Sequence, residues 1–397
     1  MRRISIFGAT GSIGQSTIDL IRRDREAYSV VALTGGRNVA LLAHDARALG
    51  AEVAVTAYED CLPALREALS GTGIQATAGA HALLEAAERE VDWTMSAIVG
   101  AAGLAPGLHA LRHGTTLALA NKESLVTAGP LLMRSAQSHG ARILPVDSEH
   151  SAVFQALVGE DQSEVERVII TASGGPFRDW SLERLKTARL AEACTHPSWD
   201  MGQRITIDSA SMFNKALELI ETREYFGFEP EQIEVLVHPG SYVHALVGFR
   251  DGALMAHLGA PDMRHAIGYA LHWPERRDLP VARLDLAKVG TLHFEAPDEN
   301  RFPALRLARE VMAIGGLAGA VFNAAKEAAL DLFIAEKIGF LDMARIVETV
   351  LNDMSSGVSL RVNALSLDNV LEADKEARAR AFSVQKYSKA ETATEIK

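Results

Sequence analysis

The sequence predicts an α/β fold with a doubly wound parallel sheet at its N-terminus. Short apolar runs alternate with amphipathic stretches through the first 150 residues, a pattern typical of parallel sheets with helices on both faces. A glycine-rich segment, Gly8–Gly14, directly follows the first apolar run. With 397 residues, the chain is also long for one domain, so we expect more than one.

The composition excludes several classes of protein. A net charge of −11 and a pI near 5.7 argue against a nucleic-acid binder, which usually carries a basic patch. The two cysteines, Cys61 and Cys194, lie far apart, which excludes a disulfide framework and suits a reducing cytoplasm. The first apolar run, Ile4–Phe7, is too short for a signal peptide, and we expect no membrane span.

The first strand and helix enclose a candidate phosphate loop. We predict a strand over Arg3–Phe7 and a helix over Gln15–Arg22, and Gly8–Gly14 between them has the spacing G-x-x-G-x-x-G. Such a loop directs backbone N–H groups and the helix dipole at a phosphate. Glycines also serve ordinary turns, but the position between strand and helix favours a nucleotide.

The second predicted strand, Ser29–Leu33, bears on which nucleotide binds. NAD-preferring folds usually place an acid after this strand to hold the ribose 2′-hydroxyl. Here Thr34–Asn38 follows, without an acid and with Arg37. The arginine fork suits a 2′-phosphate, so we predict NADPH rather than NADH. A solvated loop arginine is the alternative.

The alternation continues to residue 150. We predict further strands at Glu52–Thr56, Ile74–Thr77, Trp93–Ile98, Thr116–Ala120 and Ile143–Val146, with helices between them at Ala64–Leu69, His81–Ala87, Leu104–Arg112 and Leu131–His139. Asn121–Ser124 ends the fourth of these strands, at the edge where parallel sheets bind ligands. Lys122 there is a candidate for contact with nicotinamide or substrate, or else a lysine in solvent.

The segment Pro145–His150 is a candidate metal site. If the strand runs through Asp147, then Asp147 and Glu149 point to the same face. Two adjacent carboxylates suit a hard cation such as Mg²⁺ or Mn²⁺. A turn with solvated acids is the alternative.

The middle of the chain contains two further candidate segments. Ser173 precedes two glycines and offers a hydroxyl and backbone amides for a phosphate, although a plain turn explains it equally. The loop Cys194–Gly202 is rich in proline, glycine and serine, yet it contains Trp199. It is interpreted as a loop that closes over a ligand, or as one docked permanently on the core.

A helix predicted over Ser211–Glu221, with Asp208 or Ser209 as its N-cap, has a distinctive polar face. Its apolar residues cluster on one side, and Asn214, Lys215 and Glu218 share the other. With Ser209, the amide and the ammonium can hold a phosphate. Glu218 can complete a three-carboxylate metal site with the two acids after residue 146.

Five motifs occur together in the order of a known family: Gly8–Gly14, Ala120–Ser124, Pro145–His150, Ser173–Phe177 and Asp208–Lys215. Over nearly its full length, the chain resembles the 1-deoxy-D-xylulose 5-phosphate reductoisomerases of the non-mevalonate isoprenoid pathway. From about Leu371 onward we find no match. The resemblance implies NADPH- and metal-dependent rearrangement and reduction of 1-deoxy-D-xylulose 5-phosphate to 2-C-methyl-D-erythritol 4-phosphate. It implies Mn²⁺ or Mg²⁺ as the metal, with Co²⁺ as a further candidate, and a homodimer.

The resemblance also implies roles for individual residues. The implied metal ligands are Asp147, Glu149 and Glu218. The implied catalytic residues are these three acids together with Lys122, near the reacting carbons, and His196. Implied substrate contacts are Lys122, Ser148, Glu149, Ser173, His196, Trp199, Ser209, Asn214, Lys215 and Glu218. Implied NADPH contacts are Thr10, Gly11, Ser12, Ile13, Gly36, Arg37, Asn38, Asn121, Glu123 and Gly202. His196–Met201 resembles a mobile flap.

Three positions depart from the family pattern. Gly240 stands where the family has glutamine, Ala260 where it has glutamate, and Lys326 where it has asparagine. None is an implied ligand, but Gly240 lies in the sheet that the resemblance assigns to dimerisation.

For the whole chain, we expect a Rossmann-like NADPH-binding domain at 1–150 and an α+β catalytic and dimerisation domain with an open sheet at 151–273. A linker at 274–300 and a C-terminal α-helical bundle at 301–397 follow. Two alternatives for the function stay open. A semialdehyde or acyl-phosphate reductase would use Cys194 as its nucleophile, and a non-catalytic NADPH-binding regulator would need no aligned acids.

Overall fold

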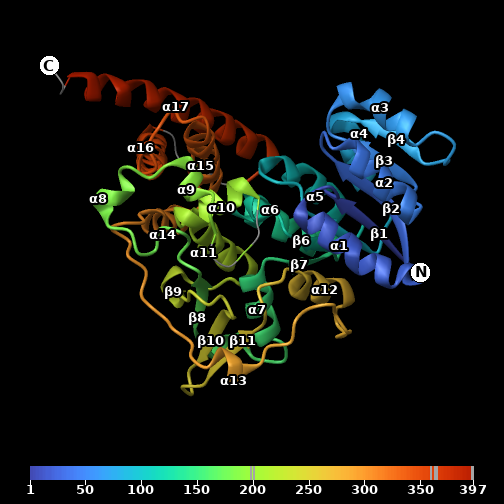
Figure 1. The fold of residues 1–397 in the computed structure, drawn as a ribbon, viewed down its shortest axis with the longest axis horizontal. Helices are drawn as coiled ribbons and strands as arrows, with labels where there is room; N and C mark the ends of the chain where they lie inside the picture. Colours follow the sequence, from blue (N-terminus) through green and yellow to red (C-terminus); the bar gives the residue numbers. More distant parts are fainter. Residues whose placement is uncertain (197–198, 200–201, 358–359, 362–364, 395–397) are drawn as a thin grey trace. The chain divides into compact units, whose positions relative to one another are not determined.

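The computed structural model describes residues 1–196, 199, 202–357, 360–361 and 365–394. The chain divides into two compact units (Figure 1). Unit 1 comprises Met1–Ser124, Leu132–Phe154 and Asp262–Arg283, and unit 2 comprises Leu125–Leu131, Gln155–Pro261 and Leu284–Lys397. The four-part division at residues 150, 273 and 300 stays a prediction.

Among the described residues, unit 1 contains a seven-stranded sheet of order β4-β3-β2-β1-β5-β6-β7, with all neighbours parallel. Its strands are β1 (Arg2–Phe7), β2 (Tyr28–Gly35), β3 (Val53–Thr56), β4 (Gln75–Ala78), β5 (Trp93–Ser96), β6 (Thr116–Leu119) and β7 (Arg142–Pro145). The helices are α1 (Ser12–Arg23), α2 (Val39–Leu49), α3 (Leu62–Ala68), α4 (Gly79–Ala87), α5 (Leu104–Leu111), α6 (Lys122–His139), α7 (Ser148–Ala156) and α12 (Arg264–His272). The order reverses between β1 and β5, and ligands bind at such a point in open α/β sheets.

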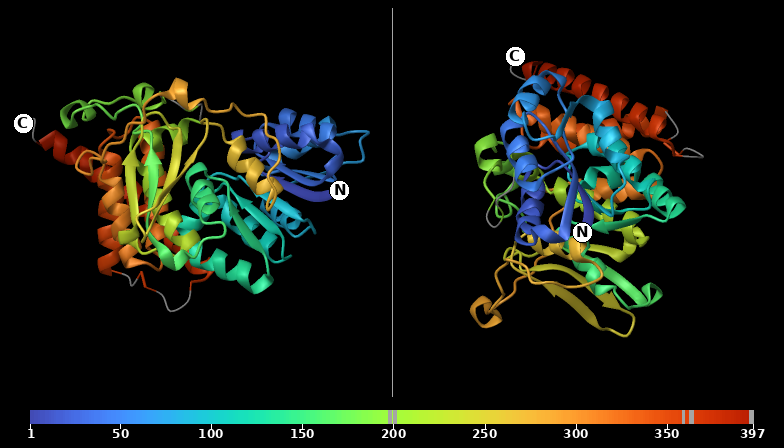
Figure 2. Two further views of the ribbon diagram at one scale, coloured as in Figure 1. Left: turned by 90° about the horizontal axis from the view of Figure 1, so that it is seen from below. Right: turned by 90° about the vertical axis from the view of Figure 1, so that its right-hand side faces the viewer.

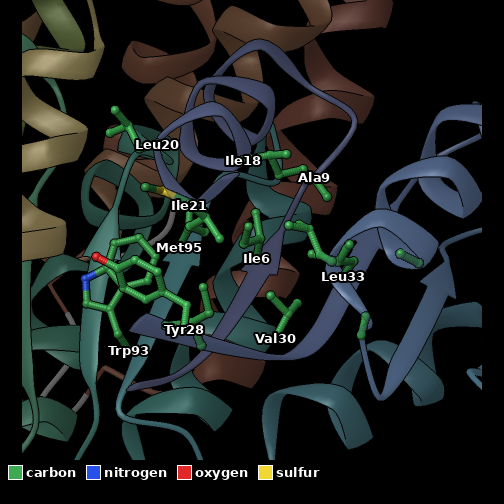
Figure 3. Close-up of a cluster of buried hydrophobic side chains, with 14 of the residues drawn as sticks. Ile6, Ala9, Ile18, Leu20, Ile21, Tyr28, Val30, Leu33, Trp93 and Met95 are labelled. Carbon is green, nitrogen blue, oxygen red and sulfur yellow. The ribbon is translucent and has the colours of Figure 1, made fainter. Parts of the chain in front are cut away.

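The core of unit 1 explains why these segments form strands and helices. The central strands are buried on both faces and consist of apolar runs, as parallel sheets require. Figure 3 shows Ile6 of β1, Val30 and Leu33 of β2 and Met95 of β5 packed with Ile18 of α1. Fully burying each such side chain stabilises the fold by about 1.5–3 kcal/mol.

A segment far along the sequence completes this core. Ile267, Ala270 and Leu271 of α12 belong to the same hydrophobic cluster, and α12 packs on α1. The indole of Trp93 donates a hydrogen bond to the carbonyl oxygen of Ala270 at 3.0 Å. The return of α12 to the seven-stranded sheet has no signal in the local sequence.

The described residues of unit 2 form a four-stranded mixed sheet of order β11-β10-β8-β9. The strands are β8 (Val165–Ala172), β9 (Ile233–Val237), β10 (Val243–Phe249) and β11 (Leu254–Leu258). They appear as the green and yellow arrows in Figure 2. Strands β10 and β11 form an antiparallel hairpin across Asp251-Gly252, a dipeptide typical of such turns. β11 lies at one edge of the sheet, and its side chains are mostly exposed.

Helices supply the rest of unit 2. They are α8 (Leu182–Leu185), α9 (Leu190–Ala193), α10 (Gln203–Ala210), α11 (Phe213–Phe226), α13 (Leu286–Val289), α14 (Ala304–Ile314), α15 (Ala318–Ile334), α16 (Asp342–Gly357) and α17 (Leu367–Thr394). The nearly continuously buried α15 packs against α14, α16 and α17, and Figure 1 shows α17 running alongside α15. The predicted bundle is therefore present.

These features confirm the predicted fold class, which combines a Rossmann-like parallel sheet, a second open sheet and a C-terminal helical region. Among the described residues, no helix is long and apolar enough to cross a membrane.

Candidate active site

The glycine loop has the geometry of a phosphate site. Gly8 has φ +85°, and a Cβ there would lie 2.3 Å from the carbonyl oxygen of Ala97. A Cβ on Gly14 would lie 2.3 Å from the carbonyl oxygen of Gly8. Only glycine therefore fits either position. Gly11 precedes α1 without a side-chain cap, so the first N–H groups of the helix can donate to a phosphate.

A partly buried polar network, which sequence reasoning did not identify, fixes this loop. The Gln15 side-chain amide donates to the carbonyl oxygen of Ala9 at 2.9 Å and to Asp45 at 2.6 Å. The other carboxylate oxygen of Asp45 accepts from Arg22 at 2.7 Å. Asp45 is fully buried on α2, so one carboxylate connects α1, α2 and the loop.

Arg37 lies in the loop after β2, as predicted, and has two neighbours that were not predicted. Its guanidinium contacts Asp60 at 2.7 Å and stacks over the ring of Tyr58, 4.0 Å from the centroid. Asn38, the next residue, caps α2 by accepting from the backbone N–H of Leu41 at 3.2 Å.

At the end of β6, Asn121 and Lys122 meet different partners. Asn121 caps α6 and donates to the carbonyl oxygen of Gly100 at 3.0 Å and to Glu123 at 2.9 Å. The Lys122 ammonium contacts Asp147 at 2.5 Å, and both side chains are nearly buried. Lys122 is therefore an ion-paired lysine, not one in solvent.

The strand does not run through Asp147, so the shared strand face considered for Asp147 and Glu149 is wrong. β7 ends at Pro145 and α7 begins at Ser148, so Asp147 and Glu149 flank the start of a helix instead of sharing a strand face. The carbonyl oxygen of Asp147 accepts from the backbone N–H of Ser151 at 2.8 Å, as in a first helical turn. The helix dipole favours both negative charges at this end. The hexapeptide is too short for its periodicity to separate strand from helix.

The remaining polar atoms of this segment also face one another. The Ser148 hydroxyl donates to the Glu149 carboxylate. The fully buried His150 ring lies 3.8 Å from Asp147. In unit 1, Lys122, Asp147, Ser148, Glu149 and His150 thus form one polar cluster.

The predicted N-cap at Asp208 or Ser209 is also wrong. Both residues lie inside α10, which ends at Ala210. Met212, with φ +61°, breaks the helix before α11 begins at Phe213. Sequence periodicity alone did not reveal that two helices meet here.

The polar face predicted for this helix is confirmed. The Asn214 amide donates to one oxygen of Glu218 at 2.6 Å, and the Lys215 ammonium contacts the other. Glu218 is fully buried and Lys215 nearly so. Spacings of three and four residues bring these side chains together on one helix surface.

His196 has a defined tautomer. Its Nδ1 accepts from the backbone N–H of Trp199 at 2.9 Å, so the proton resides on Nε2, which lies 3.0 Å from the Ser173 hydroxyl. Burial lowers the pKa of His196, which agrees with a neutral ring. Of the predicted flap, residues 197–198 and 200–201 lie outside the described residues.

A buried ion pair, also not predicted, joins α10 to α15. Lys326 Nζ lies 2.9 Å from Asp208, and both side chains are at most a tenth exposed. Asp208 directly precedes Ser209, an implied substrate contact. No sequence motif announces this pairing, because the partners are 118 positions apart.

Comparison with known proteins decides the family. Residues 4–129 match a family model described as 1-deoxy-D-xylulose 5-phosphate reductoisomerase. Residues 143–226 and 258–380 match models of C-terminal domains of the same enzyme, so the expectation of no match from about Leu371 onward is wrong as far as residue 380. A curated relative from Ruegeria pomeroyi, named 1-deoxy-D-xylulose 5-phosphate reductoisomerase, is 70% identical over 96% of this chain and 96% of its own length. The chain belongs to the 1-deoxy-D-xylulose 5-phosphate reductoisomerase family.

Solved structures of reductoisomerases have the same fold. One from Zymomonas mobilis, in complex with NADPH, is 48% identical with a TM-score of 0.91, covering 97% of this chain and 99% of that one. Another, titled DOX-P reductoisomerase in complex with NADPH, fosmidomycin and magnesium, is 40% identical with a TM-score of 0.93, covering 98% and 99%.

Membership in the reductoisomerase family removes the main reason to consider Cys194 as a nucleophile, and the geometry agrees. Both ring nitrogens of His196 face Ser173 and the Trp199 backbone, so the ring is not oriented as a base for Cys194. The Cys194 sulfur instead lies 3.7 Å from the Gln203 amide.

The departures from the reductoisomerase pattern have unequal structural explanations. Lys326, in place of asparagine, forms the buried pair with Asp208. Gly240 precedes Ser241, which has φ +52° in the turn before β10. Nothing in the structure explains Ala260.

Proposed function

We propose that this chain is an NADPH- and divalent-metal-dependent reductoisomerase that converts 1-deoxy-D-xylulose 5-phosphate to 2-C-methyl-D-erythritol 4-phosphate. The observation that carries this proposal is the cluster on α11. There an amide and an ammonium, which suit a phosphate, adjoin a fully buried carboxylate. A buried carboxylate is costly without a cation beside it.

Asp147, Glu149 and Glu218 are the proposed metal ligands. All three offer carboxylate oxygens, the donor type that Mg²⁺ and Mn²⁺ prefer. Within each unit, an ammonium contacts one of these acids: Lys122 contacts Asp147, and Lys215 contacts Glu218. The donor set therefore fits a hard divalent cation. When bound, the cation supplies a Lewis acid for the substrate's ketone oxygen.

The proposed substrate-binding residues act on different parts of the substrate. Asn214, Lys215 and Ser209 are proposed to hold the phosphate, since amide, ammonium and hydroxyl donors suit its oxygens. Ser173 and neutral His196 add further donors, and Ser148 faces the substrate carbons. Trp199 covers the bound substrate and excludes water.

Lys122 is proposed to act at the reacting carbons. Its ammonium, held at Asp147, can donate a proton to a developing substrate oxyanion or stabilise its charge. The carbon skeleton rearranges while both ends of the substrate are fixed, and the aldehyde formed is then reduced.

For NADPH, the backbone of Thr10, Gly11, Ser12 and Ile13 is proposed to bind the pyrophosphate at the start of α1. Gly36, Arg37 and Asn38 receive the 2′-phosphate, and Asn121, Glu123 and Gly202 approach the nicotinamide end. NADPH supplies the hydride.

One assay tests this function. The purified chain, supplied with 1-deoxy-D-xylulose 5-phosphate, NADPH and Mn²⁺, is expected to oxidise NADPH and release 2-C-methyl-D-erythritol 4-phosphate. EDTA should abolish turnover, and added Mn²⁺ or Mg²⁺ should restore it. Turnover that persists in EDTA would contradict the metal-dependent mechanism, and absence of turnover in every metal would contradict the function.

We also propose a homodimer in the cytoplasm. Leu254 and Met255 of β11 are about half exposed at a sheet edge, and such an edge can pair with a second chain. Sedimentation of the purified protein tests the dimer, and a monomer at micromolar concentration would contradict it. The cytoplasmic location is supported by the two free cysteines.

A further inference from the structure

The loops that follow β2 and β3 are fastened together at the carboxyl edge of the sheet in unit 1. The strands are parallel neighbours, with Gly35 opposite Thr56. The Thr56 hydroxyl donates to the carbonyl oxygen of Gly36 at 3.0 Å, and the backbone N–H of Ala57 donates to that of Gly35 at 2.9 Å. The residues after β3 are therefore held beside the proposed 2′-phosphate loop.

Two side chains from the β3 loop hold the Arg37 guanidinium. Tyr58 provides a flat surface 4.0 Å from the guanidinium carbon, and Asp60 accepts from Nη1 at 2.7 Å. The Cys61 sulfur lies 3.8 Å from the same nitrogen. Tyr58 also lines the backbone of Gly36, where an added Cβ would lie 3.7 Å from its ring.

This arrangement contributes little to folding. The side chains of Arg37 and Asp60 are 61% and 66% exposed, and exposed ion pairs add little to the stability of a fold because solvent screens them. Tyr58 is 43% exposed, outside the hydrophobic core. What the arrangement does determine is the direction of the guanidinium and the negative charge already beside it.

We propose that Tyr58 and Asp60 are specificity-determining residues that act on the 2′-phosphate through Arg37. Tyr58 strengthens the preference for NADPH over NADH, and Asp60 weakens it. Tyr58 holds the guanidinium in place for the dianionic 2′-phosphate. Asp60 occupies a guanidinium N–H before the nucleotide arrives, so it competes with and repels the 2′-phosphate. NADH presents only a neutral hydroxyl, against which Asp60 exerts no such repulsion. This inference rests on the proposed use of NADPH.

The two residues consequently have opposite effects. Replacing Tyr58 removes a cation–π contact, which at an exposed site corresponds to about a two- to five-fold change in affinity. Asp60→Asn removes the competing charge but keeps a similar shape, which corresponds to a change of about the same size in the other direction. Both effects act on the phosphate and not on the remainder of the nucleotide.

Calorimetric titration of the purified full chain tests this inference without catalysis. The probes form two pairs, NADPH with NADH and adenosine 2′,5′-bisphosphate with AMP. The members of each pair differ in the 2′-phosphate, so each comparison isolates its contribution to binding. We expect Asp60→Asn to tighten NADPH and the bisphosphate about two- to five-fold, and Tyr58→Leu to weaken both by a similar factor. NADH and AMP should change in neither variant. The gain in Asp60→Asn should shrink as salt is raised to about 1 M, because salt screens exposed charges.

Glu52→Gln is the matched control. Glu52 directly precedes β3, at the opposite end of the strand from Asp60, and is an exposed acid paired with Arg3 at 3.0 Å. The Glu52→Gln variant should leave all four dissociation constants unchanged. If it tightened NADPH binding as much as Asp60→Asn does, the effect would be one of net charge alone, and the inference would be overturned. Weaker NADPH binding in Asp60→Asn, or equal effects on NADPH and NADH, would also overturn it. Wild-type protein that binds both nucleotides equally would instead contradict the proposed function.

Discussion

Two ammonium–carboxylate contacts define the chemistry proposed for single residues. Lys122 with Asp147 and Lys215 with Glu218 each place a positive charge beside an acid that we assign to the metal. Each ammonium lowers the cost of burying its acid. When a divalent cation binds the carboxylate oxygens, each lysine is already positioned to contact the substrate.

His196 gives a prediction about pH. Burial lowers the pKa of His196 in the folded chain, whereas a histidine in the unfolded chain has a pKa of about 6.5. The contribution of His196 to stability is therefore present above that pH and is lost as the pH falls through the lowered value. Protonation would also remove the acceptor for the Trp199 backbone N–H.

We expect the free energy of unfolding to fall more between pH values of about 7.5 and 5.5 in the wild type than in His196→Asn. Asparagine keeps an acceptor but does not titrate in this range. Urea titrations at both pH values measure the free energy of unfolding of each protein. Comparing the two proteins cancels the contributions of other histidines whose pKa is also lowered by burial, including His265 and His272. Identical pH dependence in the two proteins would contradict a neutral, half-buried His196.

Residue types could be predicted from the sequence, but their contacts could not. Asn214, Lys215 and Glu218 were identified because helical spacing brings them onto one face. Asp60 and Asp45 were not, because their partners come from other loops and helices. Contacts that depend on the order of strands in the sheet leave no signal in the local sequence.

At the scale of elements, the junction of α10 and α11 determines how the proposed phosphate site is built. Met212 breaks the helix, so Ser209 lies in the last turn of α10 while Asn214 and Lys215 lie in the first turn of α11. A single helix, Ser211–Glu221 with its N-cap at Asp208 or Ser209, was predicted across this break. The left-handed residue that interrupts it is a methionine, which carries no turn signal.

Two ion pairs between α10 and α15 allow a matched test of the junction. Lys326–Asp208 is buried, whereas Arg204–Asp331 joins the same helices at 2.5 Å with both side chains about half exposed. Lys326→Met leaves a buried carboxylate without this partner, so we expect a loss of about 3–5 kcal/mol in the free energy of unfolding. Arg204→Met should cost no more than about 1 kcal/mol.

Chemical denaturation of both variants measures these losses. The double variant Asp208→Leu with Lys326→Met should recover part of the stability, because it removes both buried charges. A loss for Lys326→Met no larger than that for Arg204→Met would show that the buried pair does not fix the end of α10.

At the scale of the whole molecule, the fold class was predictable and the compact units less so. Strand–helix alternation indicated the parallel sheet. The return of α12 to the first core depends on contacts such as that between Trp93 and Ala270. These form 177 positions apart and leave no local pattern.

Helix α6 shows how the two units share elements. Its ends belong to unit 1, but Leu125–Leu131 belongs to unit 2. The helix departs from helical geometry at Ala128, two residues before Pro130. Proline removes a backbone donor and kinks a helix. The sequence prediction began this helix only at Leu131 and placed Lys122 at the end of a strand.

The central claim is the proposal that Asp147, Glu149 and Glu218 hold a single divalent cation. Electron paramagnetic resonance titration of the metal-free protein with Mn²⁺ tests it directly. We expect one Mn²⁺ per chain, and affinity weakened by more than about tenfold in each of Asp147→Asn, Glu149→Gln and Glu218→Gln, because each removes a charged ligand. Glu234→Gln, which changes an exposed acid on β9, should bind as the wild type does. Unchanged Mn²⁺ affinity in Glu218→Gln, with its fold intact by circular dichroism, would contradict the three-carboxylate site.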